Sequence, residues 1–297
     1  MTDLKGRTMQ LPWLPPGRTI VLPGRGEAFV RHHQHTDATR PTVLLLHGWT
    51  ASGDLQFFTA YEDLAAEYSF VAVDHRGHGR GLRSPDHFAL EDAADDAAAI
   101  VSELGLDGVI AVGYSMGGPI SMLLAQRHPG LVRALVVQAT ALEWRAHRRE
   151  RWQWKTVHAL GFVLRSRAYP RLMRRGIRRL LGHEHPLVDL VPWLSSELRR
   201  NDAIQIVQAG LSLSRYDARP FASTLEVPAG LLLTTRDRLV RPRKQRALAA
   251  ALSAHVETLD DDHFCTWTSP QQYSDITLRL VRHVDAQIAT RVAQSVG

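Results

Sequence analysis

The sequence contains a single cysteine, Cys265, in 297 residues. One thiol cannot form an intrachain disulfide, and no Cys/His spacing is typical of structural zinc. Uninterrupted apolar runs are short, such as residues 43–46, whereas a membrane-spanning helix needs roughly 18 apolar residues. The first residues also lack the apolar core that a secretory signal has. We therefore expect a reduced, soluble, cytoplasmic protein.

Charge is distributed unevenly along the chain. There are 36 Lys and Arg against 30 Asp and Glu, a net charge of +6. Residues 143–219 contain 16 Lys and Arg against 7 Asp and Glu, a net of +9, so the remainder is about −3. No nucleic-acid-binding motif accompanies this basic segment, so a nucleic-acid partner is not expected.

Short apolar runs recur along the chain, and they cover residues 42–46, 70–73, 109–112, 134–137, 230–234 and 256–259. Runs that are apolar on both faces are typical of strands buried in a parallel sheet. Helical patterns over residues 57–67, 90–104 and 116–128 alternate with them, and residues 19–22 and 28–32 favour a hairpin. The alternation predicts an α/β fold with a doubly wound, mostly parallel sheet.

An arginine-rich segment interrupts this alternation over residues 142–219. It has Trp, Arg and Leu at helical spacing, and it is broken by Pro170, Gly182 and Pro192. We interpret it as a helical cap inserted into a core formed by residues 1–141 and 220–297. The first 18 residues, which include three prolines, are expected to form an irregular arm.

The strongest chemical signal is Ser115, in the sequence Gly-Tyr-Ser-Met-Gly-Gly that begins at residue 113. It follows an apolar run and precedes a helical pattern. Glycines two residues before and after a serine permit a sharp strand-to-helix turn that exposes the serine hydroxyl at a helix N-terminus. Ser115 is therefore the candidate nucleophile.

A serine hydroxyl needs a base, and the base needs a carboxylate that orients it. Asp237 follows the run at residues 230–234, and His263 follows the run at residues 256–259. The candidate oxyanion donors are the backbone N–H groups of Met116, directly after the nucleophile, and of Trp49, in the loop after residues 42–46.

These motifs resemble those of the α/β-hydrolase superfamily, in particular its capped serine esterases and lipases. The resemblance covers residues 20–140 and 220–285 and includes the turn at residues 74–79, Asp-His-Arg-Gly-His-Gly. It implies the triad Ser115, Asp237 and His263. The chain departs from the family pattern at Asp262, where a glycine often precedes the histidine, and at Gly81, where a serine is common.

Some relatives take the acid from the end of the sixth strand, and Glu143 lies near that position. We favour Asp237 and interpret Asp260, Asp261 and Asp262 as solvated loop charges. The histidines at positions 32, 33, 35, 183 and 185 lack supporting carboxylates, so no metal site is expected. No cofactor is implied.

The leading hypothesis is a serine hydrolase that cleaves a small-molecule acyl ester through an acyl-enzyme. One alternative is that the same triad acts in a carbon–carbon bond hydrolase or lyase on an anionic carbonyl substrate. Another is a non-catalytic ligand-binding protein on this fold. The sequence indicates no oligomeric state.

The positive charge of the predicted cap has three interpretations. The arginines could form a solvated surface, a site of peripheral contact with an anionic membrane, or a surface that attracts an anionic substrate.

Overall fold

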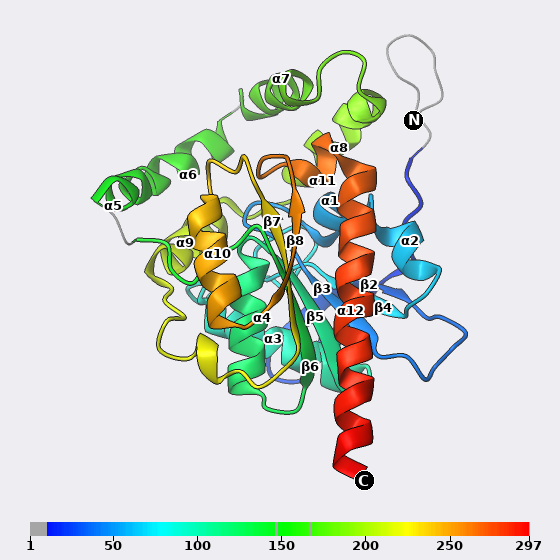
Figure 1. The fold of residues 1–297 in the computed structure, drawn as a ribbon. Helices are drawn as coiled ribbons and strands as arrows, with labels where there is room; N and C mark the ends of the chain where they lie inside the picture. The colour runs from blue at the N-terminus through cyan, green and yellow to red at the C-terminus, as the bar shows by residue number, and fades with distance from the viewer. Residues whose placement is uncertain (1–10, 146–147, 167, 297) are drawn as a thin grey trace.

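The computed structural model describes residues 11–145, 148–166 and 168–296. An eight-stranded sheet runs through its centre in the order β1-β2-β4-β3-β5-β6-β7-β8 (Figure 1). The strands are β1 Gly17–Leu22, β2 Gly26–His33, β3 Thr42–Leu46, β4 Phe70–Val73, β5 Val109–Tyr114, β6 Val132–Gln138, β7 Ala229–Thr234 and β8 His255–Leu259. The β1–β2 hairpin and the β2–β4 pair are antiparallel, and all the other neighbours are parallel. The predicted α/β architecture is confirmed.

Alternate residues of the central strands enter two separate cores. Leu44 and Leu46 of β3 pack with α3 (Leu90–Glu103), α4 (Gly117–Arg127) and α10 (Pro242–Ala251). Val43 and Leu45 pack on the opposite face with α1 (Gly53–Phe57), α2 (Tyr61–Ala65) and α12 (Pro270–Val296). Because helices cover both faces, the strand sequences are apolar at nearly every position.

The continuous helix predicted over residues 57–67 is wrong, because the chain forms two short helices, α1 and α2, there. The residues between α1 and α2, and the first residue of α2, make contacts with other parts of the chain. Phe58 packs edge-on against Trp193 of the cap at a ring-centroid distance of 5.2 Å, and the Thr59 hydroxyl donates to the Thr266 carbonyl at 3.2 Å. Tyr61 stacks on Phe70 of β4 at 5.2 Å.

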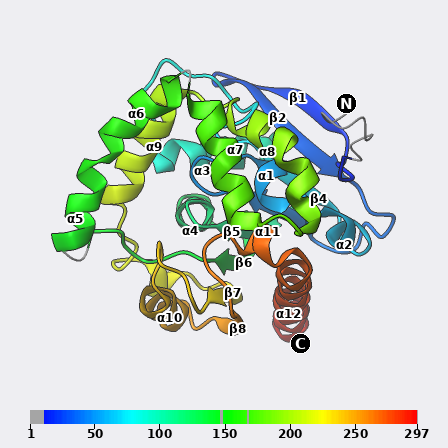
Figure 2. The same cartoon turned by 90° about the horizontal axis from the view of Figure 1, so that it is seen from above.

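In the described part of the segment predicted as a cap there are five α-helices and one 3₁₀ helix, all between β6 and β7, and we call these six elements, with the loops between them, the cap. They are α5 Arg148–Lys155, α6 Val157–Arg165, α7 Tyr169–Leu181, η1 Pro186–Leu190, α8 Val191–Leu198 and α9 Ala203–Arg215. A β-bridge between Glu143 and Asp217 joins the two ends of this segment. Seen from above, α5, α6 and α9 lie on one side of α4, and α7 and α8 lie on the other (Figure 2).

Of the arm expected over the first 18 residues, positions 1–10 lie outside the described residues, and β1 already begins at Gly17. Two short elements complete the fold, η2 (Ala222–Thr224) before β7 and α11 (Cys265–Thr268) before α12. Among the described helices, none has both the length and the apolar character that crossing a bilayer requires.

Candidate active site

Ser115 occupies the sharp turn between β5 and α4. Its φ of +51° lies in the left-handed region, which non-glycine residues rarely adopt. The two flanking glycines allow the close approach of backbone that this turn needs. A Cβ atom on Gly113 would lie 2.2 Å from the Gly117 carbonyl oxygen, and one on Gly117 would lie 1.9 Å from the Leu46 carbonyl oxygen. The strained serine is held by its N–H, which donates to the Gln138 carbonyl at 2.8 Å.

His263 lies between Ser115 and Asp237, in the loop between β8 and α11. Its Nε2 atom is 3.0 Å from Ser115 Oγ, and its Nδ1 atom is 2.8 Å from Asp237 Oδ2. With Nδ1 protonated and donating to the carboxylate, Nε2 is free to accept the serine proton. The structure thus brings Ser115 together with His263 and Asp237, both more than a hundred positions later in the sequence.

Asp237 is 3% exposed, and neighbouring groups fix both of its carboxylate oxygens. Oδ1 accepts hydrogen bonds from the backbone N–H groups of Leu239 and Val240, each at 2.8 Å. Oδ2 accepts from the Thr234 hydroxyl at 3.0 Å, and Gln245 Nε2 lies 3.4 Å away. Sequence reasoning missed Thr234 and Gln245. The polar Thr234 at the end of a buried strand is a weak indication in the sequence of a contact with Asp237, whereas nothing in the sequence indicates the contact of Gln245.

Glu143, the alternative acid, lies elsewhere. Its carboxylate forms an ion pair with Lys244 at 3.1 Å, at the base of the cap. Because Asp237 is the carboxylate that contacts His263, the geometry favours Asp237.

The two predicted oxyanion donors lie in different elements, one at the start of α4 and one in the loop after β3. Met116 is the buried N-cap residue of α4, and Trp49 lines the same pocket as Ser115 and His263. Within the described part of the chain, neither backbone N–H donates a hydrogen bond to another residue.

Two residues beside the histidine stabilise its loop. The Tyr114 hydroxyl donates to the His263 carbonyl at 3.0 Å, and Asp262 Oδ1 accepts from the Phe264 N–H at 2.8 Å. Asp262, the departure from the family pattern, thus closes a local turn around His263. Cys265 is also close, but burial raises the pKa of its thiol to about 12, so it is not a reactive thiolate at neutral pH.

Ser115 and His263 open into a small pocket of about 200 Å³. Its apolar wall includes Leu55 of α1, Leu198 of α8 and Trp267 of α11. Leu198 belongs to the cap, so cap and core together form the pocket.

A family model described as the alpha/beta hydrolase fold matches residues 41–270. The chain belongs to the α/β-hydrolase family. It is 31% identical over 252 residues to a pimeloyl-acyl-carrier-protein methyl ester esterase of Chromobacterium violaceum, a match that covers 83% of this chain and 95% of that protein.

Further similarities agree with this assignment. The hydrolase is 34% identical over 106 residues to a bifunctional esterase/perhydrolase of Acinetobacter calcoaceticus, and the match covers 33% of this chain and 37% of that protein. The chain therefore aligns with little more than a third of that relative's length. An esterase structure from Exiguobacterium antarcticum superposes with a TM-score of 0.76 at 19% identity, and it covers 90% of this chain and 100% of that one.

The cap of this α/β hydrolase is hydrogen-bonded to the loop that follows β3. The Trp49 indole N–H donates to the Ile206 carbonyl of α9 at 2.8 Å, and Asn201 Nδ2 donates to the Thr50 carbonyl at 2.6 Å. Arg80 joins the same layers through Glu197 of the cap at 2.9 Å and Asp54 of the core at 3.2 Å. Nothing in the sequence pattern indicated these contacts.

Three histidines are buried close together: His75 and His78 belong to the turn at residues 74–79, and His47 follows β3. His47 Nε2 accepts from the His75 N–H at 3.0 Å, and the His78 ring lies 5.3 Å from the His47 ring. Burial lowers the pKa of all three, for His75 to about 3 and for His78 to about 4, so the three rings are neutral at pH 7. Among the described residues, no group of three or more histidine, cysteine or acidic side chains is arranged to hold a metal ion.

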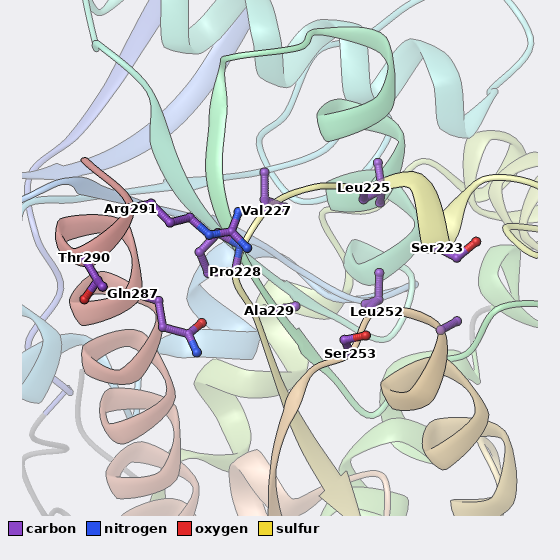
Figure 3. A pocket seen from close by; sticks show the side chains of 11 residues that line it. Ser223, Leu225, Val227, Pro228, Ala229, Leu252, Ser253, Gln287, Thr290 and Arg291 are labelled. Atoms are coloured by element: carbon purple, nitrogen blue, oxygen red, sulfur yellow. The ribbon is translucent and has the colours of Figure 1, made fainter. Parts of the chain in front are cut away.

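A second pocket of about 440 Å³ lies where the chain enters β7, between α10 and α12 (Figure 3). Its polar lining includes Ser223, Ser253 and Arg291, and the Arg291 guanidinium donates to the Glu226 carbonyl at 2.7 Å. Among the described residues, this lining includes no histidine or carboxylate that could activate either serine.

Proposed function

We propose that this α/β hydrolase cleaves carboxylic esters through a covalent acyl-enzyme. The observation that supports this most directly is the hydrogen-bonded series Ser115, His263 and Asp237, with Nε2 at 3.0 Å from the serine and Nδ1 at 2.8 Å from the carboxylate. A serine nucleophile suits a carbonyl carbon, because its attack produces a tetrahedral oxyanion that backbone N–H groups can stabilise. Two of the relatives are esterases, which agrees with this choice.

In the proposed mechanism, Ser115 Oγ attacks the ester carbonyl while His263 Nε2 accepts the hydroxyl proton. Asp237 stabilises the resulting imidazolium, and the N–H groups of Met116 and Trp49 bind the oxyanion. His263 then protonates the departing alcohol. A water molecule activated by His263 attacks the acyl-enzyme, releases the acid and restores Ser115.

The pocket favours a small substrate. Its volume of about 200 Å³ is below the roughly 300 Å³ at which pockets for drug-sized ligands begin. We therefore propose an ester with a short acyl or alcohol group beside Leu198 and Trp267.

The test is the release of nitrophenol from acyl esters of increasing chain length. Wild type should show activity that is greatest for short chains. Ser115→Ala should lower kcat by about 10⁶-fold, as when a triad serine is lost elsewhere. An intact Ser115→Ala protein with normal turnover would refute the proposal.

A different result would redirect the assignment. If the folded protein is labelled at Ser115 by a fluorophosphonate but hydrolyses no ester, the serine is activated for another reaction. Anionic diketones would then test the carbon–carbon hydrolase or lyase, and slow turnover of every substrate would favour a ligand-binding role.

A further inference from the structure

Helix α7 has two different sides. Tyr169, Ile177 and Leu181 are buried at exposures of 6%, 5% and 8%, and their spacing places them on one side of a helix. The exposed charged residues of α7 are all arginines, at positions 171, 174, 175, 178 and 179. We call this set the α7 arginines. The packing of α7 on its apolar side does not involve these arginines.

The α7 arginines differ from the arginines of the core in their partners. Among the residues whose side chains the structure describes, no carboxylate lies within ion-pairing distance of the α7 arginines, and Arg174 donates instead to the Ser195 hydroxyl at 3.2 Å. The acid on α5, Glu150, contacts Lys244 of the core at 3.0 Å. Arginines of the core behave differently, since Arg76 pairs with Asp96 at 2.7 Å.

Large apolar side chains are exposed on α7 and on the two helices before it in the cap, α5 and α6. Phe162 of α6 is 81% exposed, Trp152 of α5 is 68% exposed and Leu172 of α7 is 49% exposed. Helices α5, α6 and α7 are the outer elements of the cap, whereas α8 and α9 lie closer to the core (Figures 1 and 2). Helix α6 contacts both α5 and α7, so the exposed aromatic side chains stand on helices adjoining the one that carries the α7 arginines. Such apolar side chains are unfavourable in water but suit the boundary between lipid headgroups and acyl chains.

We propose that the outer surface of α5, α6 and α7 binds the surface of an anionic lipid bilayer. The α7 arginines contact headgroup phosphates, and Phe162 and Trp152 enter the interface between headgroups and acyl chains. The negative charge of the headgroup phosphates is complementary to the positive charge of the α7 arginines. A bilayer also gives the exposed aromatic side chains an apolar environment, whereas a small soluble anion would leave them in water. The binding is independent of ester hydrolysis.

The experiment is vesicle flotation with the full chain, using phosphatidylcholine alone or mixed with phosphatidylglycerol. Wild type should float with the anionic vesicles and not with the neutral ones, and added salt should release it. The variant Arg171→Gln/Arg175→Gln/Arg178→Gln should partition about 100-fold less, because each basic residue near an anionic surface contributes roughly fivefold. The control, Arg241→Gln/Arg243→Gln/Arg246→Gln on α10, removes the same charge from exposed positions of the core and should bind like wild type.

A second pair of variants tests the apolar contribution. Trp152→Ser/Phe162→Ser should lower partitioning roughly tenfold, whereas Val21→Ser, which changes a 65%-exposed side chain on β1, should not. Circular dichroism and fluorophosphonate labelling of Ser115 check that each variant is folded. Equal flotation with neutral and anionic vesicles, or equal losses in the cap and α10 variants, would overturn the proposal. Tighter binding to a short DNA duplex than to anionic vesicles, abolished by the α7 substitutions, would also overturn it in favour of a nucleic-acid surface.

Discussion

Asn201 of the cap holds the backbone of Thr50 in a strained conformation. Its side-chain amide donates to the Thr50 carbonyl at 2.6 Å, and its carbonyl oxygen accepts from the Gly79 N–H at 2.8 Å. Thr50 has a φ of +65° and directly follows Trp49, the proposed oxyanion donor. A residue of the cap thus positions the loop that receives negative charge in the proposed reaction.

Replacing Asn201 should weaken catalysis more than substrate binding. We expect Asn201→Ala to lower kcat about tenfold with little change in KM, because an oxyanion donor acts mainly in the transition state. Asn201→Asp keeps the acceptor for Gly79 but loses the donor to Thr50, so it should show most of the same defect. Steady-state kinetics provide the measurement, with Ser196→Ala on the neighbouring helix as a control. If kcat is unchanged in both Asn201 variants, the loop does not depend on this contact.

The carboxylate that orients His263 can be identified by two amide substitutions. Asp237→Asn should lower kcat about 10⁴-fold, because the amide favours the wrong histidine tautomer. Glu143→Gln should leave kcat near that of wild type, because Glu143 contacts Lys244 rather than His263. The same ester assay measures both variants. A larger loss in Glu143→Gln than in Asp237→Asn would reverse the assignment.

Leu198 should limit the length of the substrate. Leu198→Ala removes apolar volume from the cap wall of the pocket, so the preferred acyl chain should become longer. We expect kcat/KM for longer esters to rise about tenfold relative to the shortest one, since each accommodated methylene contributes roughly 1 kcal/mol. Leu180→Ala changes a cap leucine outside this lining and should keep the wild-type preference. An identical chain-length profile in Leu198→Ala would place the acyl group elsewhere.

The buried histidines should make the fold sensitive to acid. Burial lowers the pKa of His75 to about 3 and of His78 to about 4, and it also lowers that of His47, from 6.5 in each case. The unfolded chain therefore binds protons that the folded chain cannot, and stability is lost as the pH falls below 6.5 toward these values. Burial raises the pKa of Asp74 to about 6, which acts in the opposite direction between pH 6 and its ordinary pKa of 3.8.

Three histidines outweigh one carboxyl group by about two protons, so the free energy of unfolding should fall by roughly 2.5 kcal/mol per pH unit between pH 6 and 5. Urea unfolding at several pH values measures this slope. His78→Gln keeps an N–H donor without titrating, and it should make the slope shallower by about 1 kcal/mol per unit. An unchanged slope would show that His78 is protonated equally in the folded and unfolded chains.

The sequence by itself determined the elements that depend on near neighbours. The strands over 42–46 and 70–73 were predicted with the bounds that the structure has, because a strand buried on both faces is apolar at nearly every position. The turn at Ser115 was predictable for a similar reason, since its two glycines, the preceding strand and the following helix are contiguous. Chain order then indicated Asp237 and His263.

Only the tertiary structure decided which distant groups meet. The helix predicted over residues 57–67 is broken where Phe58 packs against Trp193, and Gln245 lies near the Asp237 carboxylate without any local signal. Asn201 contacts Thr50 across 151 positions of the chain. Periodicity and turn chemistry report the preferences of adjacent residues, whereas these contacts exist because the cap and core bury their polar groups against one another, and each buried group needs a partner.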